Sequence, residues 1–400
     1  SLMRKDQLLS QTLYNLQQAS FSPSQQKQFT RTWKPQKAAQ MIGRSLQMVR
    51  QAEGQGLLPE PKKDQHNRRL GYSLDQINAA RDHFKTRPSR QVYESPAIVA
   101  FSAYKGGCGK STLATHFAQY MAIKGYRVLL VDLDPQGTAS TLFGDNPDLH
   151  EMMRWQVADA QGLEAPEDEL HVADFISNEL SDLSSCIETS YFPGIDIIPA
   201  RVGLSQSEYY IAANSSGVDP ALARLKIGIN QVATDYDIVV MDPPPSLGML
   251  AMSVLNAANG IVIPMMPTTT NFASTKTFIR SLLDNIESMR NAGYDMQYFF
   301  EMLVINNLDE NRSSHGMITS GMRKLFTAED LLPSVMRQSA EIDNANQDMQ
   351  TVYDLEQPAG SRQTYNRCVT YLDRVNQDIE LLIRRSWPSH IPALRKVAQA

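Results

Sequence analysis

Short apolar runs rich in valine and isoleucine alternate with longer segments of helical periodicity in the larger, C-terminal part of the chain. Runs of this length between turn signals are typical of buried strands. They occupy residues 97–101, 127–132, 195–200, 237–242, 260–265 and 301–307. Buried strands that alternate with helices form a parallel sheet covered on both faces. The pattern therefore predicts an α/β fold with a mostly parallel sheet flanked by helices, and residues 145–190, acidic and weakly patterned, are expected to be a surface excursion.

The first part of the chain has a different, helical pattern. Leu9, Leu13 and Leu16 recur at helical spacing within residues 4–20, and this single apolar stripe needs a partner surface. The partner is either a second copy of the chain or the chain's own domain, and we favour the second copy. The stretch 85–96 is polar, carries two prolines and is typical of a linker. We therefore expect an N-terminal helix at 3–30, a helical domain at 31–90 and the α/β domain at 91–400.

Composition places the chain among ordinary soluble proteins, with 42% apolar and 20% charged residues. No apolar run is long enough to span a bilayer, for which about 18–20 residues are needed. The three cysteines, Cys108, Cys186 and Cys368, are widely spaced and form no CxxC pair, so neither a disulfide framework nor a zinc site is expected. The chain is expected to be cytoplasmic.

Charge is distributed unevenly along the chain, whose net charge is −5. Residues 1–95 carry 16 Lys and Arg against 7 Asp and Glu, so the remainder is strongly acidic. A basic segment attached to an acidic body indicates an arm that meets a polyanion such as DNA. A solvated basic surface is the alternative.

The first strand is followed by a glycine-rich loop, Lys105-Gly106-Gly107-Cys108-Gly109-Lys110-Ser111-Thr112, and then by an amphipathic helix. The usual P-loop formula places glycine where Tyr104 stands, so this is the deviant form KGGxGK[ST] with an additional lysine at its start. Glycines allow backbone N–H groups to surround a phosphate, and the helix N-terminus favours its charge. Lys110 is expected to reach the β- and γ-phosphates of ATP or ADP, Ser111 to ligate Mg²⁺ and Thr112 to reach the α-phosphate. Cys108 occupies the variable position and is assigned no role.

Carboxylates follow two later strands. Asp132 and Asp134 end the second strand, and Asp242 ends the strand DIVVMD. Ligands of open parallel sheets lie at the carboxyl ends of strands, and an apolar strand ending in Asp is the second Mg²⁺ element of P-loop enzymes. Alternation sends Asp132 and Asp134 the same way, toward the loop if their strand neighbours the first. One of them is expected to orient the attacking water and the other to support the loop or the metal shell. Lys105, a second lysine in the loop, is a candidate to neutralise charge in the transition state.

The motifs KGGCGKST, VDLDPQG and YDIVVMDPPPSLG, in this order, resemble those of the ParA/MinD group of deviant Walker ATPases over roughly residues 97–345. The resemblance implies a P-loop NTPase fold and an ATP-bound homodimer in which Lys105 reaches the partner's nucleotide. It also implies that Asp134 positions the hydrolytic water and that Asp242 is the Walker B carboxylate. Asn306 and Pro333 match the adenine pocket. Asn307 stands where the group often has arginine, which is a departure at that pocket.

Residues 35–53 have helix-turn-helix spacing, with small Ala39 at the helix contact, Gly43 in the turn and Val49 pointing inward. The same spacing also occurs by chance in helical domains that bind no DNA. If it is a DNA reader, its second helix faces the major groove and a following wing contacts phosphates. The candidate DNA-binding residues are Arg44, Ser45, Gln47, Met48, Arg50, Lys62, Lys63, Arg68 and Arg69.

The segment from Gly56 to Phe84 is similar to the winged readers of the MerR type. A ParA-like ATPase after such a domain resembles the large plasmid-partition type, which also represses its own operon. The resemblance implies specific operator binding in the ADP or apo state, and binding to nonspecific nucleoid DNA and a ParB-type adaptor in the ATP state. Weak candidates for nonspecific contacts are Arg384, Arg385, Arg395 and Lys396.

Three other functions have to be weighed. A membrane-recruited regulator of the MinD branch needs a C-terminal amphipathic helix, which Pro388 and Pro392 break here. An electron-transfer ATPase resembling the nitrogenase iron protein needs cluster cysteines, and neither Cys186 nor Cys368 has that setting. The third alternative is a repressor that senses nucleotide without significant turnover, and replacement of Asp134 separates it from an ATPase.

Overall fold

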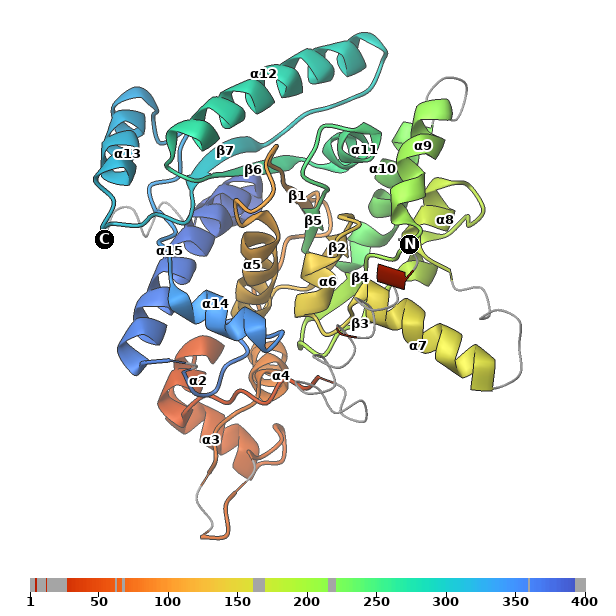
Figure 1. The fold of residues 1–400 in the computed structure, drawn as a ribbon. Coiled ribbons are helices and arrows are strands. Elements are labelled where there is room, and N and C mark those ends of the chain that lie inside the picture. Colours follow the sequence, from red (N-terminus) through yellow and green to blue (C-terminus); the bar gives the residue numbers. More distant parts are fainter. Residues whose placement is uncertain are drawn as a thin grey trace.

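The computed structural model describes residues 4–5, 12, 27–61, 63–66, 69–160, 170–214, 221–358 and 360–392. Its centre is a seven-stranded sheet with the order β3-β4-β2-β5-β1-β6-β7 (Figure 1). The strands are β1 (Ala97–Phe101), β2 (Val128–Asp132), β3 (Glu188–Thr189), β4 (Ile195–Ile198), β5 (Ile238–Asp242), β6 (Gly260–Met265) and β7 (Phe300–Ile305). All six predicted strands are present, and the mostly parallel sheet is confirmed. The short edge strand β3, which pairs antiparallel with β4, was not predicted.

Strand β5 lies between β1 and β2, so the second strand along the chain does not neighbour the first. Asp132 and Asp134 were expected to point toward the phosphate loop if β2 neighboured β1, and β2 does not neighbour β1. In the register of β2 and β5, Asp132 lies directly opposite Asp242. The carboxyl ends of β1, β5 and β2 consequently meet at one edge of the sheet in that order.

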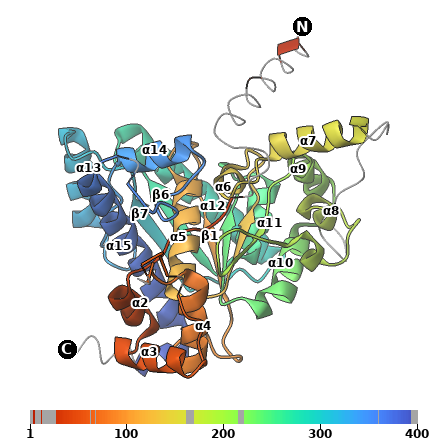
Figure 2. The same cartoon turned by 90° about the horizontal axis from the view of Figure 1, so that it is seen from below.

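Helices cover both faces of the sheet, as Figures 1 and 2 show. Alternate residues of β1 point to the two sides: Val99 packs in one buried cluster and Ile98 in the other. The first face carries α2 (Pro35–Ile42), α3 (Leu46–Gly54), α4 (Leu74–Phe84), α5 (Lys110–Lys124), α14 (Ala340–Gln347) and α15 (Arg362–Ser386). The second carries α8 (Val172–Ile176), α9 (Leu204–Ala213), α10 (Ala221–Val232), α11 (Met249–Ala257), α12 (Thr269–Asn291) and α13 (Ser313–Leu325). The remaining elements are α6 (Thr138–Leu142), α7 (Pro147–Ala160), η1 (Leu183–Cys186), η2 (Ala233–Asp235) and η3 (Pro388–His390).

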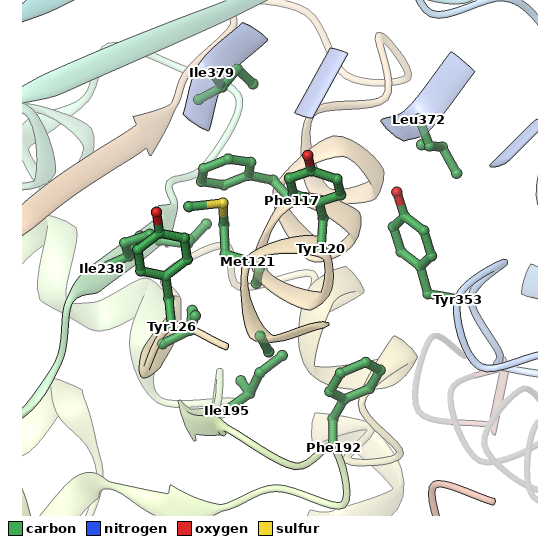
Figure 3. Close-up of a cluster of buried hydrophobic side chains, with 14 of the residues drawn as sticks. Phe117, Tyr120, Met121, Tyr126, Phe192, Ile195, Ile238, Tyr353, Leu372 and Ile379 are labelled. Carbon is green, nitrogen blue, oxygen red and sulfur yellow. The ribbon is translucent and has the colours of Figure 1, made fainter. Parts of the chain in front are cut away.

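Helix α5 is the central helix of the first face. It begins after Gly109 and ends at Gly125, both with left-handed backbone torsions, and most of its side chains are buried. Figure 3 shows Phe117 and Met121 of α5 among Ile238 of β5 and Leu372 and Ile379 of α15. A helix that is apolar on most sides is stable only when surrounded, which explains why α15 covers it.

Residues 145–190 were expected to be a surface excursion, and this is wrong for their second half. Phe175 and Ile176 of α8 are 2% and 0% exposed, and Leu183 of η1 is fully buried. They pack with α9 and α10 on the second face. The apolar residues are spread over a five-residue helix and a four-residue turn, too short for a periodic pattern to be recognised.

The N-terminal helices share a continuous hydrophobic cluster with α5 and α15, which includes Ile42, Ile77 and Phe117. The predicted linker 85–96 has no regular secondary structure, but it is held by hydrogen bonds. Arg90 donates to the carbonyl oxygens of Tyr236 (3.1 Å) and Thr234 (2.9 Å), and the Glu94 carboxylate accepts from Ser389. The apolar stripe of the predicted N-terminal helix, Leu9, Leu13 and Leu16, lies outside the described residues.

All three cysteines are buried and free. Within the described part of the chain, no helix is long and apolar enough to cross a membrane.

A buried histidine in α5 gives a pH-dependent stability. Nδ1 of His116 lies 2.7 Å from the carbonyl oxygen of Thr112, and Nε2 accepts from the amide of Val352 at 3.2 Å, so the neutral ring fits both contacts. Burial lowers the pKa of His116 to about 4. An unfolded histidine titrates near pH 6.5, so only the unfolded chain takes up this proton between about pH 6.5 and 4. Stability therefore falls as the pH drops through this window.

Replacing His116 by glutamine should remove this dependence. Each pH unit inside the window corresponds to about 1.4 kcal/mol. We expect the free energy of unfolding of the unmutated protein to fall by about 2 kcal/mol more between pH 7 and pH 5 than that of His116→Gln, measured by urea denaturation. His66→Gln, on an exposed turn, is the matched control and should behave like the unmutated protein. Equal losses in the unmutated protein and His116→Gln would contradict a neutral buried ring.

Candidate active site

The loop between β1 and α5 has the backbone that its glycines predict. Gly107 and Gly109 have φ angles of +77° and +80°, in the left-handed region that favours glycine. A side chain added to Gly106 or Gly107 would meet nothing within 4 Å, so both lie at open space. The loop thus joins a buried strand to a helix N-terminus and has open space beside these two glycines, an arrangement that suits phosphate groups.

The side chain of Lys110 lies between two carboxylates from neighbouring strands. Its Nζ donates to Oδ1 of Asp242 and lies 3.3 Å from Oδ2 of Asp134. Burial alone would lower the pKa of this ammonium, but the charges of Asp242 and Asp134 outweigh it and the net shift is upward. The predicted residues Lys110, Asp134 and Asp242 are therefore brought together by the fold, although they are distant in the sequence.

The carboxylate of Asp132, by contrast, accepts hydrogen bonds from other groups of the chain. Its Oδ1 accepts from the backbone amide of Asp134 at 3.2 Å, and its Oδ2 accepts from the amide and hydroxyl of Ser140 at 2.8 and 2.7 Å. Burial and the nearby Asp242 raise the pKa of Asp132 against these hydrogen bonds. These contacts are those of a residue that supports the loop after β2, one of the two roles expected for this pair. Both oxygens of Asp132 thus accept hydrogen bonds from the chain, and its expected role in the metal shell stays a prediction.

The site has the oxygen ligands that Mg²⁺ prefers. Oδ2 of Asp242 is buried and has no hydrogen-bond partner among the described residues, so it is an oxygen available to a cation. Ser111 and Thr112 lie half-buried at the start of α5, and Lys105 is exposed at the outer end of the loop. Mg²⁺ in such sites is held by one or two protein oxygens together with phosphate oxygens, so Ser111 and Asp242 would suffice.

Comparison with known proteins agrees with this geometry. A family of AAA domains (AAA_31) matches residues 96–298, just over half of the chain. The protein SopA of Escherichia coli K12 is 30% identical over 380 residues, which cover 92% of this chain and 92% of SopA. A relative from Sinorhizobium fredii that carries the name of a replication protein A is 28% identical over 400 residues, with 96% and 94% of the two chains covered. A solved structure titled "Partition Protein" aligns with a TM-score of 0.64 at 17% identity over 96% of this chain and 99% of that one, which shows a shared fold.

The chain belongs to the ParA-type plasmid-partition ATPases. Its expected P-loop NTPase fold is confirmed.

The two predicted adenine-side residues of this ParA-type chain have different settings. The side-chain amide of Asn306, which follows β7, donates to the backbone carbonyl of Cys108 in the phosphate loop. Pro333 is exposed, and its carbonyl oxygen accepts from Arg323 at 2.6 Å. The side chain of Asn306 thus contacts the phosphate loop, whereas the hydrogen bond of Pro333 is made to Arg323 of α13.

The predicted turn between α2 and α3 is present in this ParA-type chain. Gly43 has a φ angle of +75°, Ala39 and Val49 are buried between the helices, and Ser45 caps α3 by accepting from the amide of Met48 at 3.3 Å. Three of the candidate DNA-binding residues project from the exposed side of α3, namely Gln47, Met48 and Arg50.

Two of the predicted basic contacts of the ParA-type chain are engaged internally. Arg69 pairs with the carboxylate of Glu53 and donates to the hydroxyl of Tyr72 at 2.8 Å, and Glu53 is only 4% exposed. A buried carboxylate needs a cation, so Arg69 is committed to the domain and is not a free phosphate contact. Arg44 donates to the carbonyl oxygen of Phe84 at 3.2 Å.

The remaining basic candidates are less constrained or lie elsewhere. Lys63 is exposed, forms an ion pair with Glu60 at 2.7 Å and makes an isolated antiparallel bridge with Arg69. Lys62, Arg68, Arg395 and Lys396 lie outside the described residues. Arg385 is exposed on α15, and Arg384 donates to His390 at 3.2 Å.

Sequence reasoning missed Glu208 of α9. Its carboxylate accepts from the amides of Met249 and Leu250, the first of α11, directly after the proline-rich loop that follows Asp242. A side chain at Gly248 would collide with this carboxylate, so the glycine in the motif is the only sequence signal of the contact.

Proposed function

We propose that this chain is an ATP-dependent plasmid-partition protein that works as a homodimeric switch. In this proposal it binds nonspecific DNA in the ATP state and its own operator in the ADP or apo state. The observation that carries it is the phosphate loop whose Lys110 meets Asp134 and Asp242. The names of its relatives support the partition role, and a ParB-type adaptor is then the expected partner. The protein would act in the cytoplasm, associated with the nucleoid.

Hydrolysis is assigned to three residues. Phosphoryl transfer needs positioning and charge neutralisation more than covalent chemistry. Asp134 lies 3.3 Å from Lys110, and we assign its carboxylate to the attacking water. Lys110 neutralises charge on the transferred phosphate, and exposed Lys105 is free to reach the nucleotide of a partner copy. Mg²⁺, held by Ser111 and Asp242, supplies electrostatic stabilisation when it is bound.

DNA binding is assigned to the domain of α2, α3 and α4. Gln47, Met48 and Arg50 are exposed on α3, the second helix of the predicted reader, and Lys63 is exposed on the wing. Exposed side chains on a second helix after a tight turn are the ones that contact base edges. The excess of basic residues in 1–95 supports contact with a polyanion.

A physical connection joins the two proposed sites. Helix α5 begins at the phosphate loop, and its other end is held by Arg81 of α4 and by Arg87 of the segment 85–96. Arg81 of α4 donates to the carbonyl oxygens of Ile123 (2.9 Å) in α5 and Met41 (3.1 Å) in α2. Arg87 donates to the carbonyl oxygen of Gly125 at 2.7 Å. A displacement of α5 on nucleotide binding would therefore act directly on the helices of the DNA reader.

The test is DNA binding by the full chain with Mg-ADP and with a nonhydrolysable ATP analogue. The two duplexes are the region upstream of its own coding sequence and a random sequence of equal length, at the same salt concentration. We expect the ratio of the two affinities to change at least tenfold between the two nucleotides. Arg50→Ala should weaken binding to the upstream duplex by about 10- to 100-fold, while Arg280→Ala, an exposed arginine of α12, should not. An unchanged ratio removes the switch, even if ATP is hydrolysed.

A further inference from the structure

Asn306 is held between two strand ends and the phosphate loop. Its backbone amide donates to the carbonyl oxygen of Met265 at 2.9 Å, at the end of the neighbouring strand β6. Its side-chain amide donates to the carbonyl oxygen of Cys108, which lies 198 positions earlier in the chain. The residue is 5% exposed, so its position is fixed by the sheet rather than by solvent.

The same amide fills the space behind Gly109. A Cβ atom on Gly109 would collide with Nδ2 of Asn306, and Gly109 also has a φ angle of +80°. Glycine is therefore required at this position for two independent reasons. The contact also means that Asn306 limits how far the loop can move toward β7.

The hydrogen bond to Cys108 sets the direction of the next backbone amide. In a planar trans peptide, the carbonyl and the N–H group point in opposite directions. Because Asn306 holds the Cys108 carbonyl, the N–H group of Gly109 in the same peptide points away from Asn306. A phosphate loop works by aiming such N–H groups at its ligand before the ligand arrives.

We propose that Asn306 is a positioning residue of the phosphate loop, which aims the Gly109 amide at the phosphates by holding the Cys108 carbonyl. This inference rests on the proposed nucleotide site and refines it. It differs from the adenine contact implied by the family resemblance, because a residue that shapes the loop acts on any phosphate ligand. A residue that contacts the base acts only on ligands that contain that base.

The experiment measures binding of Mg-ADP, Mg-GDP and inorganic tripolyphosphate to the full chain by calorimetry. Asn306→Ala removes the donor, and Asn306→Asp replaces it by a carboxylate that repels the Cys108 carbonyl. Loss of a hydrogen bond that organises the site corresponds to about a tenfold change. We expect both variants to lose the same factor, about tenfold or more, for all three ligands, with the larger loss in Asn306→Asp. Asn311→Ala, at an exposed position of the loop after β7, is the matched control and should bind all three ligands like the unmutated chain.

Each other outcome overturns the inference. If ADP binding falls while tripolyphosphate binding stays the same, Asn306 contacts the base. If neither variant changes any affinity, Asn306 does not position the loop. Thermal unfolding of the ligand-free variants is followed in parallel. If the affinity for all three ligands falls only at temperatures where the variants are unfolded, the inference is also overturned. If the unmutated chain binds none of the ligands, the proposed function fails as well, which separates the two failures.

Discussion

Replacing Asp134 by alanine is expected to abolish ATP turnover while leaving ATP binding intact. The carboxylate lies beside Lys110, at the edge where β1, β5 and β2 end, and its other oxygen accepts from the amide of Gln136 at 3.0 Å. Positioned acid–base or water-orienting groups contribute about 10²- to 10⁴-fold to rate. We therefore expect steady-state turnover to fall at least about 100-fold, with the dissociation constant for Mg-ATP changed less than threefold.

Two further variants show whether the charge of Asp134 matters. Asp134→Asn keeps the acceptor for Gln136 but not the carboxylate, so it should lose turnover like the alanine variant. Asp348→Ala, an exposed carboxylate at the end of α14, should have the turnover of the unmutated protein. Unchanged turnover in Asp134→Ala would contradict the role assigned to this carboxylate.

Replacing Lys110 by glutamine should strongly weaken nucleotide binding. Lys110 is the only cation that we find beside Asp134 and Asp242 in the described residues, and its side chain is 6% exposed. Each charge-assisted hydrogen bond to phosphate contributes about 1.5–3 kcal/mol, so the affinity for Mg-ADP should fall about 100-fold. Breaking a buried ion pair also costs about 3–5 kcal/mol of stability, so binding must be measured where circular dichroism shows the variant folded.

The matched control for Lys110 is Lys124→Gln at the other end of the same helix. Lys124 has a half-exposed side chain, and its ammonium is 3.9 Å from Glu380. This variant should bind Mg-ADP like the unmutated protein. If Lys110→Gln binds Mg-ADP normally while folded, the lysine does not contact phosphate.

The sequence predicts the strands well but not their order. Each of the six runs rich in valine and isoleucine is a strand, because a strand buried on both faces is apolar along its whole length. Strand order depends on contacts between distant segments, which no local pattern records. The position of β5 between β1 and β2, and the opposition of Asp132 and Asp242 that follows from it, are visible only in the fold.

In the candidate site, too, the sequence predicts local features but not those that depend on contacts between distant segments. The loop residues and the strand-end aspartates could be located from motifs, because glycine, lysine and carboxylate chemistry is required at fixed local positions. The roles of Asp132, Arg69 and Asn306 could not, because each depends on a tertiary partner: Ser140, Glu53 and the Cys108 carbonyl. A basic residue near a wing is an equally good phosphate contact or internal ion-pair partner until its neighbours are known.

The measurement that tests the central claim most directly is titration of the full chain with Mg-ATP and Mg-ADP, followed by calorimetry and by thermal unfolding. Binding at the loop between β1 and α5 predicts saturation at one nucleotide per chain and a melting temperature that rises with nucleotide concentration. It also predicts that Lys110→Gln needs about 100-fold more nucleotide to give either signal. No heat of binding and no change in melting temperature at millimolar nucleotide would contradict a nucleotide site at this loop.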